Sequence, residues 1–255
     1  MTLGELLTLL RVSILNDRSD RESGSADYLW TDQTLVTFIN EAHRRFARRG
    51  LMLRDATTDE ATKVVLKAGQ TVYPLHESVI SVMSAKLEDA VADLTRAGHS
   101  LFAAFSPPSE SWVDPASFHN HQPGPTLAFS TDEAINSIDG DTFEQVSLRV
   151  YPAPRAEDAG KVIRLRVVRE PIEDFNVRAL SAVPEIPRAH HLEMLDWAAY
   201  LALRIVDDDA GAPKRAQEFA ASFEAHVKEA RNLAMRKLFA PTGWGFGRGG
   251  FSWGS

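Results

Sequence analysis

Two stretches near the start of the chain repeat apolar residues at the spacing of an amphipathic α-helix. In the first, Thr2 and Glu5 have the spacing of a capping box, and apolar residues then recur every three or four positions as far as Ile14. In the second, Thr31 stands at an N-cap position before an apolar stripe, and we expect Gly50 to stop the helix. The pattern therefore predicts two N-terminal helices joined by a polar segment.

The period of the pattern changes at Ala61. From there to Val168 the chain carries the β-rich runs TKVVL, QTVYPL, VISVMSAKL, TLAF, QVSLRVYP and GKVIRLRVV, which turn residues separate. Apolar and polar residues alternate in the last two runs, as is typical of a sheet with one face in water. Eleven of the 13 prolines lie between Pro74 and Pro187, and because proline breaks helices, the helices are expected mostly at the two ends.

Helical spacing returns after Pro187. The run AHHLEMLDWAAYLALRIV is apolar on nearly every side, which predicts the central and most buried helix. Pro213 then opens a long final helix that is expected to end near Phe239. An apolar stripe on this helix is predicted to face the core and consists of Ala216, Phe219, Ala220, Phe223, Val227, Ala230, Ala234 and Leu238.

Together these elements predict an α+β fold. A four-helix core, made of two N-terminal and two C-terminal helices, is expected to carry an inserted antiparallel β domain and an extended C-terminal tail. We place the helical core at residues 1–60 and 171–239 and the β domain, with its long acidic loop, at 61–170. The tail rich in glycine and aromatic residues is residues 240–255.

The composition is that of an ordinary folded protein, with 44% hydrophobic and 25% charged residues. No apolar run approaches the roughly 18 residues that a membrane span needs, so we expect no membrane partner. The start of the chain lacks a basic leader before its apolar stretch, which predicts that there is no signal peptide. The absence of cysteine excludes disulfides and thiolate metal sites and fits synthesis in a reducing cytoplasm.

Charge is unevenly distributed behind the net value of −7. After Asp209 there are 7 Lys and Arg against 3 Asp and Glu, whereas no Lys or Arg lies between Arg96 and Arg149. That acidic middle segment contains Glu110, Asp114, Asp132, Glu133, Asp139, Asp141 and Glu144. Because phosphate binding needs cations, the segment argues against a protein that grips nucleic acid through its middle.

The tail, APTGWGFGRGGFSWGS, combines six glycines with four large aromatic rings and one charge. Glycine costs roughly 1 kcal/mol per position in a helix, so the tail is predicted to be extended. It is too short to bury its own rings. Either it is a disordered terminus or another surface receives the rings.

Candidate metal sites in the sequence are weak. His190 and His191, with Glu193 and Asp196, would suggest a metal, but adjacent helical residues point about 100° apart. The pair His119 and His121 alternates as on a strand without a nearby cluster of partners, and the run Asp207 to Asp209 lacks the alternate spacing of a calcium loop. We therefore predict no metal and no cofactor.

Catalytic motifs are also missing, since GxSxG, the P-loop and HExxH do not occur. We therefore predict that the protein is not an enzyme and has no catalytic residues. The alternative is a soluble, cytoplasmic, hydrolase-like enzyme with an unrecognised His/Asp site.

Four stretches, in their order along the chain, resemble the head-to-tail adaptor (connector) proteins of tailed bacteriophages. They are YLWTDQTLVTFINEAHRRFARRG, LKAGQTVYPLHESVISVMSAKL, LRVYPAPRAEDAGKVIRLRVVREP and EIPRAHHLEMLDWAAYLALRIVDDDAGAPKRAQEFAASFEAHV. The resemblance covers about residues 1–238, with the acidic middle segment as the variable part.

This resemblance implies a structural virion protein of the phage neck that is assembled in the host cytoplasm. Its copies would form a ring, typically of twelve, that binds the portal protein and the next tail or nozzle protein. DNA would pass through the ring's channel without specific binding. In several family members the C-terminal extension climbs onto the portal, so we expect portal docking by Trp244, Phe246, Arg248, Phe251 and Trp253, with Arg231, Arg236 and Lys237 of the last helix. We expect the seven carboxylates of the acidic middle segment to line the channel, the alternative being a solvated outer loop.

Overall fold

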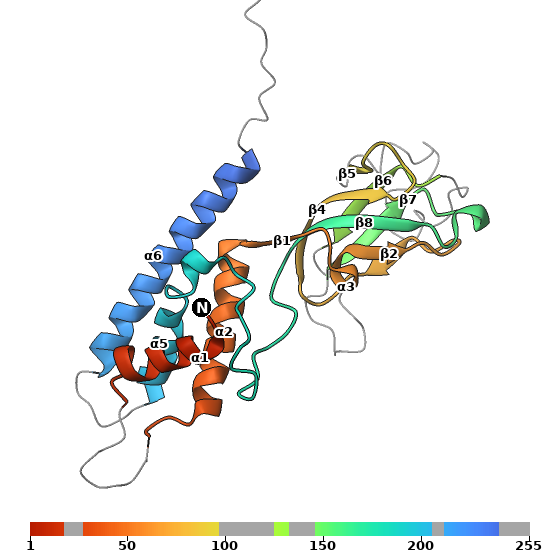
Figure 1. Ribbon diagram of the computed structural model, residues 1–255. Coiled ribbons are helices and arrows are strands. Elements are labelled where there is room, and N and C mark those ends of the chain that lie inside the picture. The colour runs from red at the N-terminus through yellow and green to blue at the C-terminus, as the bar shows by residue number, and fades with distance from the viewer. Residues whose placement is uncertain (18–27, 97–124, 133–145, 206–211, 240–255) are drawn as a thin grey trace, which may run out of the picture.

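The computed structural model describes residues 1–17, 28–96, 125–132, 146–205 and 212–239. In these ranges the protein has five α-helices and two four-stranded sheets, so the predicted α+β class is confirmed. Figure 1 shows the helices, except the short α3 (Asp59–Thr62), gathered into one body, and the sheets with α3 in a second part beside it, joined through β1 and through the chain that leaves β8.

The helical body begins at the predicted capping box. α1 (Leu3–Thr8) starts after Thr2, whose hydroxyl accepts the Glu5 N–H while the Glu5 carboxylate accepts the Thr2 N–H. The helix then continues as a π-helix, η1 (Leu9–Ile14), which spacing alone did not predict. α2 (Asp32–Gly50) starts after Thr31, whose side chain accepts the Thr34 N–H.

The predicted stop at Gly50 is one residue early. Gly50 is still helical, and Leu51 takes the left-handed conformation with φ 51°. Glycine fits at position 50 because a Cβ there would lie 2.8 Å from Cγ of Met52.

The predicted third helix also begins later than expected. The 3₁₀ turn η4 (Arg188–His190) and further turns precede α5 (Leu195–Ile205), and Leu192 within those turns is half exposed. An apolar run does not distinguish such i→i+3 turns from an α-helix, which is why the helix start was wrong. α6 (Ala212–Phe239) matches its predicted bounds within one residue.

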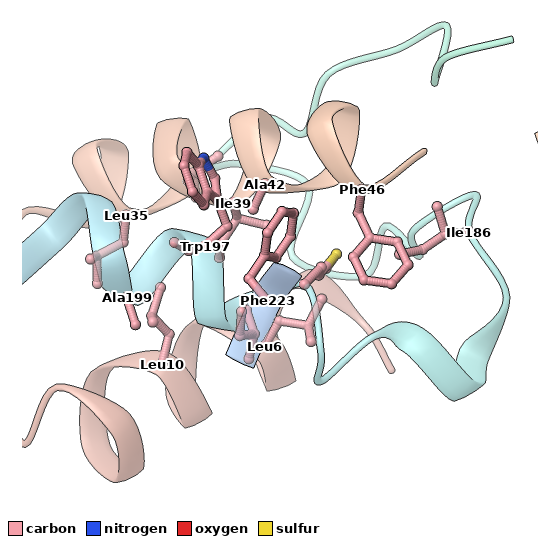
Figure 2. Close-up of a cluster of buried hydrophobic side chains, with 14 of the residues drawn as sticks. Leu6, Leu10, Leu35, Ile39, Ala42, Phe46, Ile186, Trp197, Ala199 and Phe223 are labelled. Carbon is pink, nitrogen blue, oxygen red and sulfur yellow. The ribbon is translucent and has the colours of Figure 1, made fainter. Parts of the chain in front are cut away.

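The body is held together by one apolar core into which α1, α2, α5 and α6 all point (Figure 2). Phe223 of α6 is fully buried, with ring centroids 5.7 Å from Phe46 of α2 and 5.1 Å from Trp197 of α5. Most of the predicted α6 stripe is buried or half-buried, while the side chain of Leu238 lies outside the described part. Aromatic pairs at these distances add stabilisation beyond their buried area.

The β region contains two sheets. In the first, β8 (Val162–Arg169) pairs antiparallel with β1 (Leu53–Asp55), β2 (Lys63–Val65) and β4 (Val79–Leu87). In the second, the order is β3 (Val72–Pro74), β7 (Ser147–Tyr151), β6 (Ala128–Asp132) and β5 (Thr95–Arg96).

Two features of the β region differ from the sequence-based expectation. β5 runs parallel to β6, so the second sheet is mixed and not wholly antiparallel. Strand structure also begins at Leu53, before the predicted start at Ala61, and a short helix, α3 (Asp59–Thr62), follows it. Three-residue strands such as β1 are too short to show an alternation of apolar and polar residues in the sequence. Pairing with a long neighbouring strand stabilises them.

A second apolar core lies between the sheets and is separate from that of the helical body. Its largest fully buried side chains are Leu66, Phe129, Leu148, Ile163 and Leu165. The predicted alternation holds for most of β8, but its end is buried at Val167, Val168 and Arg169, where the strand meets the helical body. Among the helices that the structure describes, none is both long and apolar enough to cross a membrane.

Candidate partner-binding surfaces

The predicted docking residues of α6 lie near its C-terminal end. Arg231 and Arg236 are exposed, and Leu233 between them is half exposed. The guanidinium of Arg54 in β1 donates to the carbonyl of Ala234, so β1 is attached to this end of α6. Lys237 belongs to α6, but its side chain lies outside the described part.

The other predicted site residues cannot be placed. The aromatic residues and Arg248 of the tail lie outside the described residues, as do Glu110, Asp114, Glu133, Asp139, Asp141 and Glu144. Asp132 is the last residue of β6 and is opposite Ser147 of β7, with only its backbone described. Portal docking and channel lining therefore stay predictions.

A cleft that the sequence did not predict lies between the helical body and the β region. It has a volume of about 680 Å³. One wall is the polar face of α2, and the other consists of the β3–β4 turn and the chain after β8. We call this the junction cleft, and it is lined by Glu41, Arg44, Arg45, Arg48, Arg49, His76, Glu77, Ser78, Glu170, Pro171 and Ile172.

The wall opposite α2 is fixed by hydrogen bonds. The Glu170 N–H donates to the Ser78 carbonyl at 2.7 Å, which ties the end of β8 to the turn before β4. Nδ1 of His76 lies 2.8 Å from Oγ of Ser78 and accepts the Ser78 N–H at 3.2 Å. The two segments therefore form one rigid surface.

Three of the four arginines in the junction cleft are paired within the chain. Arg44 pairs with Asp174, Arg48 with Glu170, and Arg49 with Glu224 of α6. The four arginine positions were readable in HRRFARRG, where they repeat at helical spacing. The cleft itself was not readable, because its second wall comes from segments distant in the sequence.

Arg45 differs from these three neighbours. Its guanidinium carbon lies 3.8 Å from the centre of the Trp197 ring, and among the described residues it forms no ion pair. Its Nε is buried without a hydrogen-bond partner. The stacking holds the planar guanidinium of Arg45 against the helical body. No carboxylate of a described residue forms an ion pair with it.

The orientation of the β region on the helical body is fixed by buried polar contacts. Nε of Arg169 donates to Asp55 at 2.7 Å, and the same guanidinium lies 2.6 Å from Glu185. Burial alone would raise the pKa of Asp55, but hydrogen bonds from Thr58, Thr57 and Arg169 hold it well below its usual range.

The Asn40 amide adds a further contact to the segment that returns from the β region. It donates to the Phe175 carbonyl at 3.0 Å and accepts the Phe175 N–H at 2.8 Å. These two hydrogen bonds hold the returning segment against α2.

The candidate metal residues point to different partners. His190 lies 2.6 Å from Glu193, whereas His191 lies 3.1 Å from the amine of Met1 and 2.9 Å from the Ile186 carbonyl. Asp196 lies 3.3 Å from His226 of α6. Throughout the described ranges, no three His, Asp or Glu side chains form a group that could hold a metal. His119, His121 and Asp207 to Asp209 lie outside those ranges.

His43 is a buried titratable residue that the sequence analysis missed. Its ring stacks on Phe175 with centroids 5.2 Å apart, and its Nε2 is buried without a hydrogen-bond partner. Burial, with smaller contributions from the charges of His191 and Arg44, lowers its pKa to about 4. The ring is therefore neutral at physiological pH. The sequence contained a signal for this burial, because His43 follows Ile39 by four residues and so lies on the apolar face of α2.

A family model matches nearly the whole chain. The model of the SU10 adaptor protein family matches residues 1–243, which span every described element of the helical body and the β region. No curated protein sequence matches the chain. The match confirms the resemblance to phage head-to-tail adaptors, so the protein is a phage structural adaptor and a virion component. The chain belongs to the SU10 adaptor protein family.

Proposed function

We propose that this protein forms a homo-oligomeric ring beneath the portal, joins the portal to the tail, and continues the DNA channel. The observation that carries the proposal is the family match from residue 1 to 243, which includes the helices, the β region and the start of the tail. In this role the protein assembles in the host cytoplasm and acts without a cofactor or catalysis. Twelve copies would match the usual number in such rings.

The chain divides, in this proposal, into three functional parts. The helical core comprises residues 1–60 and 171–239, the inserted β domain residues 61–170, and the docking tail residues 240–255. Two separate apolar cores support the first two parts. Each part could then contact a different neighbour: another copy, the next tail or nozzle protein, and the portal.

The tail is proposed to dock on the portal together with the end of α6. Aromatic residues and arginine dominate protein–protein hot spots, and the tail carries four rings and Arg248. Each ring could contribute roughly 1.5–3 kcal/mol by burial, less about 1–2 kcal/mol for each residue that is fixed. One tail is therefore marginal, and a ring of tails attaches firmly by avidity. Exposed Arg231 and Arg236, with Lys237, would meet an acidic portal surface.

The acidic middle segment is proposed to lie in or near the DNA channel. A negative wall repels phosphate and lets the duplex slide without sticking. Charge reversal at Asp139 and Asp141 should then slow genome packaging or ejection. Unchanged phage yield and ejection would instead favour a solvated outer loop.

Deleting Pro241 to Ser255 tests the docking proposal. The truncated protein should keep its helical circular dichroism and its thermal midpoint, because residues of the described helices and strands supply two apolar cores. It should lose stable attachment to portal in co-sedimentation. A full-length variant with Trp244, Phe246, Phe251 and Trp253 changed to serine separates the effect of the rings from that of chain length. Full portal affinity in both variants would place docking elsewhere.

A further inference from the structure

We propose that the junction cleft receives the acidic tip of a second copy of this chain. The acidic tip is the β4–β5 turn, residues 88–93. This inference rests on the proposed ring function and names the contact that joins neighbouring copies. It follows from one arginine of the cleft and two carboxylates of the tip that form no salt bridge among the described residues of their own chain.

The cleft side offers a cation that is already in position. Arg45 is held over Trp197 at 3.8 Å and forms no ion pair with a described residue, whereas Arg44, Arg48 and Arg49 each have one. A guanidinium whose plane is fixed can bind a carboxylate through two parallel hydrogen bonds with little further ordering. Half-buried Ile172 gives the same cleft an apolar patch.

The tip side offers carboxylates and an apolar residue. Asp89 and Asp93 are exposed and form no salt bridge within the described part of the chain. Val91 between them is 98% exposed, the largest fraction among the exposed large hydrophobic side chains. Because a carboxylate stands on each side of Val91, one of them could bind Arg45 while Val91 packs against Ile172. Glu41 and Glu77 also line the cleft, so Arg45 is the cation that the tip would contact.

The acidic tip is also firmly held. The Glu88 N–H donates to the Val162 carbonyl at 2.9 Å, and the Leu94 N–H donates to the Ala85 carbonyl at 2.8 Å. Within the turn, the Ala90 N–H donates to the Leu87 carbonyl at 3.0 Å. Both partners are therefore ordered before they meet, which lowers the entropic cost of association.

A chain cannot fill its own junction cleft with its own tip. β4 begins at Val79, directly after cleft residue Ser78, and ends at Leu87 at the base of the tip, with two irregularities in its pairing with β8. At full extension its nine residues would span about 26 Å. The occupant must therefore come from another copy. A contact between two unlike surfaces of identical chains is heterologous, and repetition of such a contact closes a ring when the rotation permits.

Charge reversal on each side tests this contact in the full-length protein. The tip variant carries Asp89→Arg and Asp93→Arg, and the cleft variant carries Arg45→Glu. Mass photometry over a concentration series, with and without portal, should show self-association weakened at least about tenfold in each variant alone. A 1:1 mixture of the two variants should recover assembly, because each altered surface meets the other.

Matched controls reverse exposed charges outside both surfaces. Arg178→Glu, in the chain that returns from the β region, and Glu218→Arg on α6 should assemble like the wild type. The tip variant lies on an exposed turn, so it decides the question even if Arg45→Glu fails to fold. Thermal midpoints from circular dichroism show which variants are folded.

The outcomes separate this inference from the proposed function. Weakened single variants with recovery in the mixture support the contact. Normal assembly of the folded tip variant overturns it and leaves the ring proposal standing, as does a mixture of two folded variants that fails to recover assembly. A wild-type protein that remains monomeric alone and with portal would contradict both.

Discussion

Changing His43 to phenylalanine should remove much of the protein's sensitivity to mild acid. The His43 ring is buried, with a pKa of about 4 against 6.5 in an unfolded chain. Between these values the unfolded state binds more protons than the folded state, so stability falls as the pH drops below 6.5. From the two pKa values, this one group removes about 2 kcal/mol by pH 5 and about 3 kcal/mol by pH 4.

Phenylalanine is a suitable replacement because the contacts of His43 are mainly those of a ring. It can keep the stack on Phe175, and Nε2 has no hydrogen-bond partner to lose. Urea unfolding should be followed at 222 nm, where the helical body dominates, at pH 7.5, 6 and 5. The free energies of the two proteins should differ by about 2 kcal/mol more at pH 5 than at pH 7.5.

Other titrating groups act on both proteins and cancel in the comparison. Burial lowers the pKa of His191, which weakens the fold in acid, and burial raises the pKa of Asp196, which has the opposite effect. Stability curves that stay parallel from pH 7.5 to 5 would refute the assignment of this sensitivity to His43.

Three further substitutions test the packing by urea unfolding. Phe223→Ala should cost about 3–5 kcal/mol, because the ring is fully buried against Phe46 and Trp197, and a loss below 1 kcal/mol would contradict that placement. Arg11→Met should cost about 3–5 kcal/mol, since it leaves the carboxylate of Asp17, 2.6 Å from Arg11, buried and uncompensated; adding Asp17→Asn should recover part of the loss. Gly69→Ala should cost about 1 kcal/mol, because φ is +72° there and only glycine adopts it freely. Gly50→Ala, its helical counterpart, has no left-handed φ to strain, but the new methyl would lie 2.8 Å from Cγ of Met52, which must shift to admit it.

Features set by local chemistry were predictable from the sequence. The Thr2–Glu5 capping box, the Thr31 cap and the α6 stripe each depend on residues within one or two turns of helix. The long strands were also predicted, β4 from its β-rich run of nine residues and β8 from the alternation over most of its eight residues.

Features set by distant contacts were not predictable. β1 and the parallel pairing of β5 with β6 exist because longer strands give them partners. The delayed start of α5 reflects a region in which His191 is anchored by the Ile186 carbonyl and the Met1 amine. The spacing of apolar residues in a sequence does not predict such contacts between distant residues.

The candidate sites divide in the same way. Arg231 and Arg236 were expected on the last helix and are exposed there, but their predicted role in docking depends on a partner. The four arginines of α2 were visible in the sequence. The junction cleft that they line was not, because its other wall comes from residues 76–78 and 170–172.

Electron microscopy of the full-length protein mixed with its portal protein would show whether the adaptor forms a ring on the portal. We expect a closed ring of adaptor density, coaxial with the portal and seated on one face of it, with an open central channel. Portal particles that remain bare, beside adaptor molecules that neither form rings nor bind, would contradict the proposed function.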